Sequence, residues 1–436
     1  MITLIEARNY RCLRLVRQPL GPFQMLVGPN AAGKSALLDV VRFLGCLTTD
    51  GLHAAIAERT SNVFDLLWRR SGHEFEIAIE VSIPGQKRRL APLDYDVFRY
   101  EVAIEMASDT SEAAIGAERG FLKNTSHPST AALGANTDVG RHPEPVITRF
   151  TTHSDFEKEC GRAKRLVLLK ETRICGNESS GVLKTDDLFF REGGAELGQP
   201  LPFRFGARKS ALANLPEDET LFPVATWFKQ FLAKESIFYQ LDAKQLQAAS
   251  PPAQPRTLQP NAANLPWVVA DFQEKQPAAF ADWLAHLRIA LPDLRWIDTV
   301  LREDDRHRYL VLEYGGGLRV PSWSVSEGTL RLIALTLPAY LQDWEGTLLV
   351  EEPENGLHPL AIEVAFQSLS SVGRTQVLLA THSPLLVGLA KPNEMLCFTK
   401  DDDGATQIMS GNRHPRLADW HGEVDLGTLF ASGVFE

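Results

Sequence analysis

The chain has 436 residues, a hydrophobic fraction of 44% and a formal net charge of −10 at pH 7, with a sequence pI near 5.6. This length allows two or three domains with a substantial core. The acidic balance excludes a strongly basic nucleic-acid-binding surface as a property of the whole chain. The sequence contains no run of 18 apolar residues, so we expect no membrane partner. The scattered cysteines (Cys12, Cys46, Cys160, Cys175 and Cys397) show no metal-ligand spacing, and we expect reduced thiols in a cytoplasmic protein.

A phosphate-binding pattern, G-x-x-x-x-G-K-S, directly follows the apolar run Phe23–Val27, which predicts a buried strand. Its residues are Gly28, Pro29, Asn30, Ala31, Ala32, Gly33, Lys34 and Ser35. The glycines allow backbone N–H groups to point at phosphate oxygens, and the N-terminus of the following helix adds partial positive charge. Lys34 can reach the β- and γ-phosphates, and the Ser35 hydroxyl can ligate a metal. The pattern therefore predicts that the chain binds ATP and Mg²⁺.

The middle of the chain gives weaker signals. Period-2 alternation over Phe75–Ile83 and Tyr95–Met106 predicts an antiparallel sheet. Residues 107–145 are rich in small and polar side chains, and we expect a long loop or partly ordered insertion there. Helical spacing recurs over Ser210–Leu246 and again over Ala278–Leu291, and we interpret the aromatic residues of these helices as core.

An acidic strand end is the second half of the predicted site. The apolar segment Thr347–Val350 predicts a strand, and Glu351, Glu352 and Glu354 follow it. A strand that carries carboxylates at its C-terminal end beside a phosphate loop is the Walker B arrangement. We assign Glu351 to the metal and Glu352 to orienting and polarising the attacking water. The alternative is an ordinary acidic loop after a buried strand.

Two further motifs complete the predicted site. A second apolar strand, Gln376–Ala380, ends just before His382, whose imidazole can donate to the γ-phosphate. The alternative is a purely structural histidine. Ser326 fits the N-cap of a helix, and Gly328 permits close approach to the start of that helix. Because one nucleotide cannot use two helix N-termini well, we expect the Ser326 helix to meet the nucleotide of another subunit.

Together these motifs resemble the ABC-type ATPases of the RecF/SMC group, and more closely the bacterial RecF-like AAA family ATPases. The matching elements are Asn9–Arg11, Gly28–Ser35, Ser326–Arg331, Val350–Pro359 and Ala380–Pro384. The resemblance implies an α/β fold: a P-loop NTPase, specifically an ABC-type ATPase head, with an antiparallel β subdomain and a helical lid or arm insertion. The implied division is 1–106 for the N-terminal half of the head, 107–308 for the insertion and 309–436 for the C-terminal half.

The resemblance also implies a head-to-tail homodimer that forms on ATP, with each ATP held between one phosphate loop and the partner's Ser326 helix. The implied activity is ATP hydrolysis by a conformational switch in DNA repair or recombination, or in anti-phage defence, with DNA as a candidate partner. A second hypothesis is a slowly hydrolysing scaffold that controls an effector protein without binding DNA. A transporter subunit is disfavoured because Thr329 and Leu330 follow Gly328, where transporter signatures usually have a glutamine.

The chain departs from the family pattern in three places. Glu351 stands where ABC proteins generally have Asp, and its extra methylene favours metal coordination through a water. The glutamine of the Q-loop has only Gln86 as a candidate. Residues 383–436 are too few for the TOPRIM nuclease domain that overcoming-lysogenisation-defect nucleases carry at this point, so we expect no DNA cleavage by that route.

Overall fold

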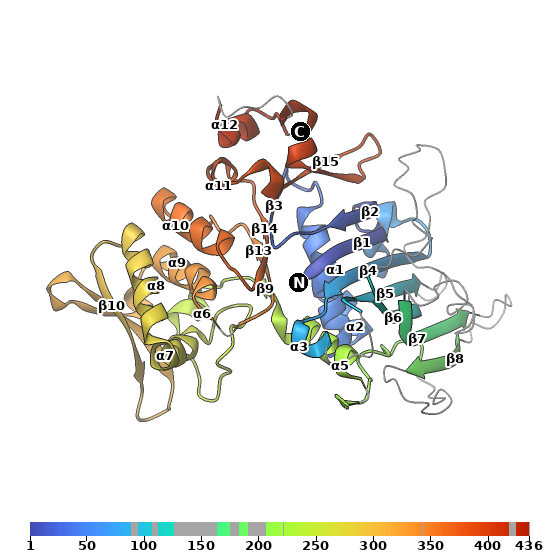
Figure 1. The fold of residues 1–436 in the computed structure, drawn as a ribbon, viewed down its shortest axis with the longest axis horizontal. Coiled ribbons are helices and arrows are strands. Elements are labelled where there is room, and N and C mark those ends of the chain that lie inside the picture. Colours follow the sequence, from blue (N-terminus) through green and yellow to red (C-terminus); the bar gives the residue numbers. More distant parts are fainter. Residues whose placement is uncertain are drawn as a thin grey trace. The chain divides into compact units, whose positions relative to one another are not determined.

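A computed structural model describes residues 1–88, 95–106, 112–125, 164–174, 183–190, 206–220, 222–342, 344–417 and 424–435. The chain divides into two compact units (Figure 1). The first unit comprises Met1–Leu20, Ser35–Ser236 and Lys400–Ile408, and the second comprises Gly21–Lys34, Ile237–Thr399 and Met409–Glu436. We describe each unit by itself. The predicted division at residues 106 and 308, into head halves and insertion, stays a prediction.

The first unit is built on a seven-stranded antiparallel sheet in the order β2-β1-β4-β5-β6-β7-β8. Its strands are β1 (Ile2–Tyr10), β2 (Leu13–Pro19), β4 (Glu74–Ser82), β5 (Val97–Met106), β6 (Ala113–Lys123), β7 (Lys164–Ile174) and β8 (Leu183–Phe190). Its helices are α1 (Lys34–Thr49, whose first residue lies in the second unit), α2 (Leu52–Ala57), α3 (Gly85–Arg88) and α5 (Pro223–Gln230). The predicted pairing of the two period-2 segments is confirmed by the antiparallel register of β4 and β5.

Helix α1 packs on this sheet through an apolar face and one buried carboxylate. Phe43 meets the rings of Tyr10 and Phe75 edge-on at centroid separations of 5.9 and 5.6 Å. Asp39 accepts hydrogen bonds from the Tyr10 hydroxyl at 2.6 Å and from Nε of Arg59 at 2.8 Å. Burial, followed by the Asp39 charge, raises the pKa of Tyr10 well above its usual value, so the phenol stays a neutral donor. This network fixes the helix that continues directly from the phosphate loop.

The second unit contains a mainly parallel sheet whose strands follow the order β15-β3-β14-β13-β9. These are β15 (Met395–Lys400), β3 (Phe23–Val27), β14 (Gln376–Ala380), β13 (Thr347–Glu351) and β9 (Ser236–Tyr239). A separate antiparallel sheet joins β10 (Leu294–Leu301), β11 (Arg308–Tyr314) and β12 (Arg319–Pro321). The strand β16 (Thr406–Ser410) crosses the boundary between the two units. The sequence predicted β3 and β14 to the residue.

Helices of the second unit bury one face of that parallel sheet. They are α6 (Ala243–Gln247), α7 (Leu265–Lys275), α8 (Pro277–Ala290), α9 (Glu327–Thr336), α10 (Pro359–Ser370), α11 (Pro384–Leu389) and α12 (Leu426–Ala431). One apolar core joins Met25 of β3, Val350 of β13 and Leu379 of β14 to buried side chains of α7 to α10. Burial of each such side chain contributes about 1.5–3 kcal/mol, so the three parallel strands are held firmly beside one another. Within the described ranges, we find no helix with the length and apolar character that a bilayer crossing requires.

Two expectations about the middle of the chain were wrong in whole or in part. Ala113–Lys123, placed in a loop by its composition, is the buried strand β6, because backbone pairing with β5 can use small side chains where neighbours pack closely. The helical spacing expected over Ser210–Leu246 is borne out only in part: the segment contains α5, a short π-helical turn at Phe231–Glu235 and the start of α6, but also the strand β9. The aromatic residues of α5 are core, as expected. Residues 107–111 and 126–145 of the expected loop, and Cys160 and Cys175, lie outside the described residues, and Cys12, Cys46 and Cys397 are free thiols.

Replacing Asp39 with Ala should lower the free energy of unfolding by about 3 kcal/mol, because the buried Tyr10 hydroxyl and Nε of Arg59 would both lose their acceptor, and among the described residues Arg59 would keep only the more exposed Glu58 as an ion-pair partner. The Arg59 side chain is only 6% exposed, whereas the Arg14 and Asp403 side chains are 52% and 59% exposed. Removing this exposed pair by Arg14→Ala should change stability by under about 0.5 kcal/mol. Urea denaturation of both variants makes the comparison, and equal losses would contradict a structural role for Asp39.

Candidate nucleotide site

Three strand ends of the second unit meet at one edge of its parallel sheet. β14 pairs in parallel with β13, with Glu351 opposite Ala380, and also with β3, with Ala380 opposite Leu26. The phosphate loop follows β3, the acidic segment follows β13 and the segment containing His382 follows β14. Because the C-terminal ends of adjacent parallel strands share one edge, residues more than 300 positions apart in the sequence converge there. The structure therefore brings Lys34 together with the predicted carboxylates.

The phosphate loop has the backbone geometry that its glycines were expected to permit. The φ angles of Gly28, Ala31 and Gly33 are 145°, 60° and 110°, all in the region that favours glycine. A Cβ atom on Gly28 would collide with the backbone carbonyl of Phe398 in β15. Alternating backbone conformations of this kind turn successive N–H groups toward one concavity that suits an anion. The loop is thus shaped to hold phosphate oxygens.

The Lys34 side chain is held across its own loop. Its Nζ donates to the carbonyl oxygens of Gly28 at 2.7 Å and Pro29 at 2.9 Å. Burial lowers the pKa of Lys34, and the carboxylates of Glu352, Glu351 and Glu354, in that order of strength, act against this shift. The Lys34 ammonium therefore lies within electrostatic range of all three carboxylates of the acidic segment. The electrostatic effect on Lys34 is a consequence of the convergence set by the strand pairing.

Glu351 has the properties of a metal-facing carboxylate. It is the last residue of β13, and its Oε1 is buried with no hydrogen-bond partner in the described part of the chain. A buried, unpaired carboxylate oxygen is unfavourable unless a cation or an ordered water satisfies it. Ser35 supplies a hydroxyl in the first turn of α1. An oxygen donor of either kind suits Mg²⁺, which takes few protein ligands and completes its shell with water and phosphate oxygens.

Within the described ranges, no group of three or more His, Cys, Asp or Glu side chains is arranged to hold a metal ion.

Glu352 sits at a sharp reversal of the chain. Its φ of 47° is uncommon for a residue other than glycine, and such outliers cluster at functional sites. Its N–H donates to the Ala380 carbonyl at 2.8 Å. Its Oε2 accepts from Nδ2 of Asn355 at 2.7 Å, and its Oε1 lies 3.3 Å from Nδ1 of His382. The side chains of Glu352 and His382 are 47% and 45% exposed, so both are open to a ligand and to water.

Glu354 and Thr381 are neighbours in this site to which the sequence analysis assigned no role. The Thr381 hydroxyl donates to Oε1 of Glu354 at 2.5 Å and accepts from the Ser383 N–H at 2.9 Å. The other oxygen of Glu354, Oε2, is buried without a partner in the described part of the chain. In the sequence, the signal that could have indicated a role for Glu354 is its position as the third acidic residue after the predicted strand Thr347–Val350.

Ser326 caps α9 as predicted. Its hydroxyl accepts from the Thr329 N–H at 3.3 Å and lies 2.8 Å from the Thr329 hydroxyl, so its side-chain hydrogen bonds stay within its own helix end. A Cβ on Gly328 would lie 2.6 Å from the carbonyl oxygen of Gly356. The start of α9 therefore packs directly on the loop that carries the acidic residues. Gln86, the candidate for the Q-loop, is exposed in α3 of the first unit.

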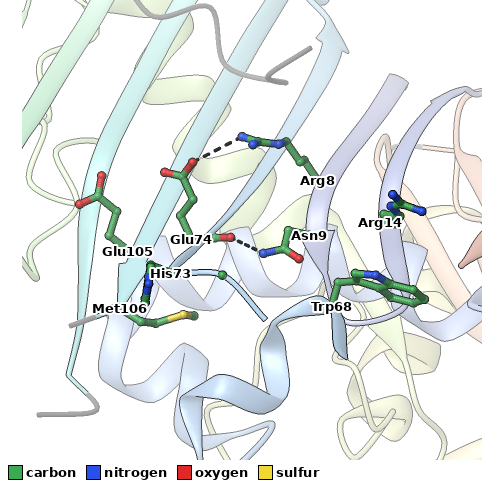
Figure 2. Close-up of a pocket in the computed structure, with 9 residues that line it drawn as sticks. Arg8, Asn9, Arg14, Trp68, His73, Glu74, Glu105 and Met106 are labelled. Carbon is green, nitrogen blue, oxygen red and sulfur yellow. Dashed lines mark hydrogen bonds and ion pairs between the residues drawn. The ribbon is translucent and has the colours of Figure 1, made fainter. Parts of the chain in front are cut away.

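A separate cavity of about 450 Å³ lies in the first unit (Figure 2). Its lining includes Arg8, Asn9, Arg14, Trp68 and Glu74, and none of the predicted site residues. Figure 2 shows Arg8 directed at Glu74, with an Arg8–Glu74 separation of 3.4 Å, while the Asn9 side chain donates to the Glu74 carbonyl at 2.7 Å. Because these polar groups already satisfy one another, we assign the nucleotide to the strand ends of the second unit.

The fold is that of an SMC-type ATPase head. A crystal structure described as the SmcHead bound to the C-winged helix domain of ScpA matches with a TM-score of 0.51 at 14% identity, over 94% of this chain and 97% of that one. Two other SMC head structures, one derived from Pyrococcus furiosus and one from Thermotoga maritima, each at 12% identity, give TM-scores of 0.45 and 0.42. The first match alone carries the fold assignment, which confirms the expected ABC-type head.

Sequence comparisons identify the family. A curated protein, the OLD nuclease of Thermus scotoductus, is 42% identical over 41 residues, which is 9% of this chain and 8% of the nuclease. The model of a family described as "AAA domain, putative AbiEii toxin, Type IV TA system" matches residues 138–388. That range starts after the phosphate loop, so the loop and the family match are separate observations that agree. Since the match covers more than half of the chain, the protein belongs to this family of AAA-domain proteins, with the RecF/SMC-like ABC-type ATPase character that its motifs indicated.

Proposed function

We propose that the protein binds ATP with Mg²⁺ at the strand ends of the second unit and hydrolyses it to ADP and phosphate. The observation that supports this most directly is the parallel pairing of β14 with both β3 and β13, which brings Lys34 and the Glu351–Glu354 segment to one sheet edge. Membership of an AAA-domain family and an SMC-type fold agree with nucleotide use.

Each residue has a role that follows from its environment. The loop N–H groups and Lys34 would bind the β- and γ-phosphates, and Lys34 would exchange its two carbonyl partners for phosphate oxygens. Ser35 and Glu351 would hold Mg²⁺, which when bound neutralises phosphate charge. Glu352 would accept a proton from the attacking water, because its carboxylate is exposed and oriented by Asn355. His382, beside Glu352, would donate to the γ-phosphate.

Replacing Lys34 with Ala should weaken ATP binding by roughly 100-fold or more, because a charge-assisted contact to the β/γ-phosphates is lost. Titration of ATP in the presence of Mg²⁺ measures this. Lys275→Ala is a matched control, since that lysine is 62% exposed and pairs with Asp271 one helical turn away. Unchanged affinity in Lys34→Ala would contradict the assignment of the phosphate loop.

Replacing Glu352 with Gln should leave ATP affinity nearly unchanged and slow turnover by on the order of 100-fold, as expected when a general base is lost. The ATP-bound state should then accumulate. Glu363→Gln, an exposed substitution on α10 of the same unit, is the control for the loss of one negative charge. Turnover of Glu352→Gln at the wild-type rate would remove Glu352 from the role of base.

We further infer that two copies share each nucleotide. Ser326 is exposed and makes its side-chain hydrogen bonds within its own helix cap, which leaves the N-terminus of α9 open to an anion from outside. A head-to-tail dimer that forms on ATP would place this terminus on the partner's γ-phosphate. Glu352→Gln should consequently be dimeric in ATP.

A mixing experiment tests the shared site. Ser326→Arg and Lys34→Ala should each be inactive alone, because each damages both sites of a symmetric dimer. In the mixed dimer one site carries both defects and the other carries neither, so ATPase activity should partly recover. The variants are mixed over a range of ratios and assayed for phosphate release. No recovery at any ratio would argue against sharing.

We consider two hypotheses for the biological role: a switch that acts near DNA, in anti-phage defence or repair, and a scaffold that controls an effector protein. Family membership, described in terms of a putative toxin of a type IV toxin–antitoxin system, favours anti-phage defence over repair. The short similarity to an OLD nuclease agrees with a switch that acts near DNA. The other hypothesis is a slowly hydrolysing scaffold that controls an effector protein. ATPase rates measured with and without single-stranded, duplex and ended DNA distinguish the two hypotheses. DNA should stimulate the ATPase rate of a switch that acts near DNA, but not that of a scaffold.

A further inference from the structure

A chain of hydrogen bonds connects the acidic segment to the turn that carries His382. The Thr381 hydroxyl gives its single proton to Oε1 of Glu354 and accepts from the N–H of Ser383. Thr381 is fully buried, and it directly precedes His382. The residues on both sides of the histidine are therefore tied to a carboxylate of the neighbouring strand end.

We propose that Glu354 and Thr381 are positioning residues that set the place of His382 relative to Glu352. The inference rests on the proposed ATPase function and deepens it. His382 itself is 45% exposed, and its Nδ1 lies a long 3.3 Å from Oε1 of Glu352. Its place is consequently fixed through the backbone at Thr381 and Ser383. Only a hydroxyl at position 381 can donate to Glu354 and accept from Ser383 at the same time.

The surroundings of Glu354 suit positioning and argue against a role as base. Its Oε1 is committed to Thr381, and its Oε2 is buried. The residue lines a small crevice whose other members are mostly apolar, including Pro353, Leu357 and Leu386. Glu352, by contrast, is 47% exposed. The two carboxylates thus have different environments: Glu352 is open to water, whereas Glu354 holds the turn through Thr381.

Three substitutions in the full-length chain test the proposal. Thr381→Val keeps the shape but loses the hydroxyl, and kcat should fall by about 10-fold or more, as for outer-shell partners of catalytic groups. ATP affinity should stay within about 3-fold, because the loop N–H groups and Lys34 would supply most of the phosphate contacts, and the substitution leaves them in place. Thr381→Ser keeps the hydroxyl and should restore kcat to within about 3-fold of wild type. Glu354→Gln should also reduce kcat only slightly, since its amide oxygen can accept the same hydrogen bond from Thr381. If Glu354 were instead the general base, Glu354→Gln would lose activity as Glu352→Gln does.

The decisive measurement is a double-mutant cycle with His382→Ala. If Thr381 acts through His382, then Thr381→Val should change kcat by less than about 2-fold in the His382→Ala background, because the group that it positions is gone. An equal reduction in both backgrounds, or a Thr381→Ser variant as slow as Thr381→Val, overturns the proposal. Glu354→Ala removes the acceptor of the same hydrogen bond. It replaces Thr381→Val in the cycle if the Thr381→Val protein does not fold.

Failure of this inference can be told from failure of the proposed function. Hydrolysis that depends on Lys34 but is insensitive to Thr381→Val overturns the positioning role alone. Hydrolysis that survives Lys34→Ala unchanged overturns both, because the site itself would then lie elsewhere.

Discussion

The arrangement of the site depends on one backbone constraint, the parallel pairing of β14 with β3 on one side and β13 on the other. Register in a parallel pair is set by hydrogen bonds along the strands, and the side chains of these strands lie in one apolar core. If β3 or β13 were shifted by one residue relative to β14, the phosphate loop or Glu351 would move along the sheet edge and buried side chains would turn outward. Local motifs from the two ends of the chain therefore become one site only through this sheet.

The charges at that edge are unbalanced without a ligand. Three carboxylates act on Lys34, and burial already makes its charged form less favourable. Buried oxygens of Glu351 and Glu354 also lack hydrogen-bond partners in the described part of the chain. A divalent cation held by Glu351 and Ser35 would supply positive charge where the protein provides too little. The same cation would offset the negative phosphates that the loop is shaped to bind, so cation and nucleotide favour each other's binding.

How much the sequence could predict depends on the range of the interactions involved. β3, β13, β14 and the cap at Ser326 depend on short apolar runs and one local side-chain bond, and the sequence placed them closely. β6 was missed because its small residues owe their strand conformation to pairing with β5. The bond between Glu354 and Thr381 joins residues from two strand ends, and no pattern within either segment indicates it. Residue types could be found from motifs, whereas their partners required the tertiary fold.

The loop after β13 also gives a physical path from the reacting groups to the signature helix. It begins at Glu352 and ends at Gly356, and both residues have positive φ, at 47° and 77°. The carbonyl of Gly356 lies so near Gly328 that a Cβ there would be 2.6 Å away, and the far side of Gly356 faces the Arg331 side chain. Since packed interiors have little free space, a shift of Glu352 toward a ligand displaces the loop against α9. In the dimer proposed above, a change at the carboxylate would therefore reach the helix terminus assigned to the partner's nucleotide, and hydrolysis in one site would affect nucleotide binding in the other.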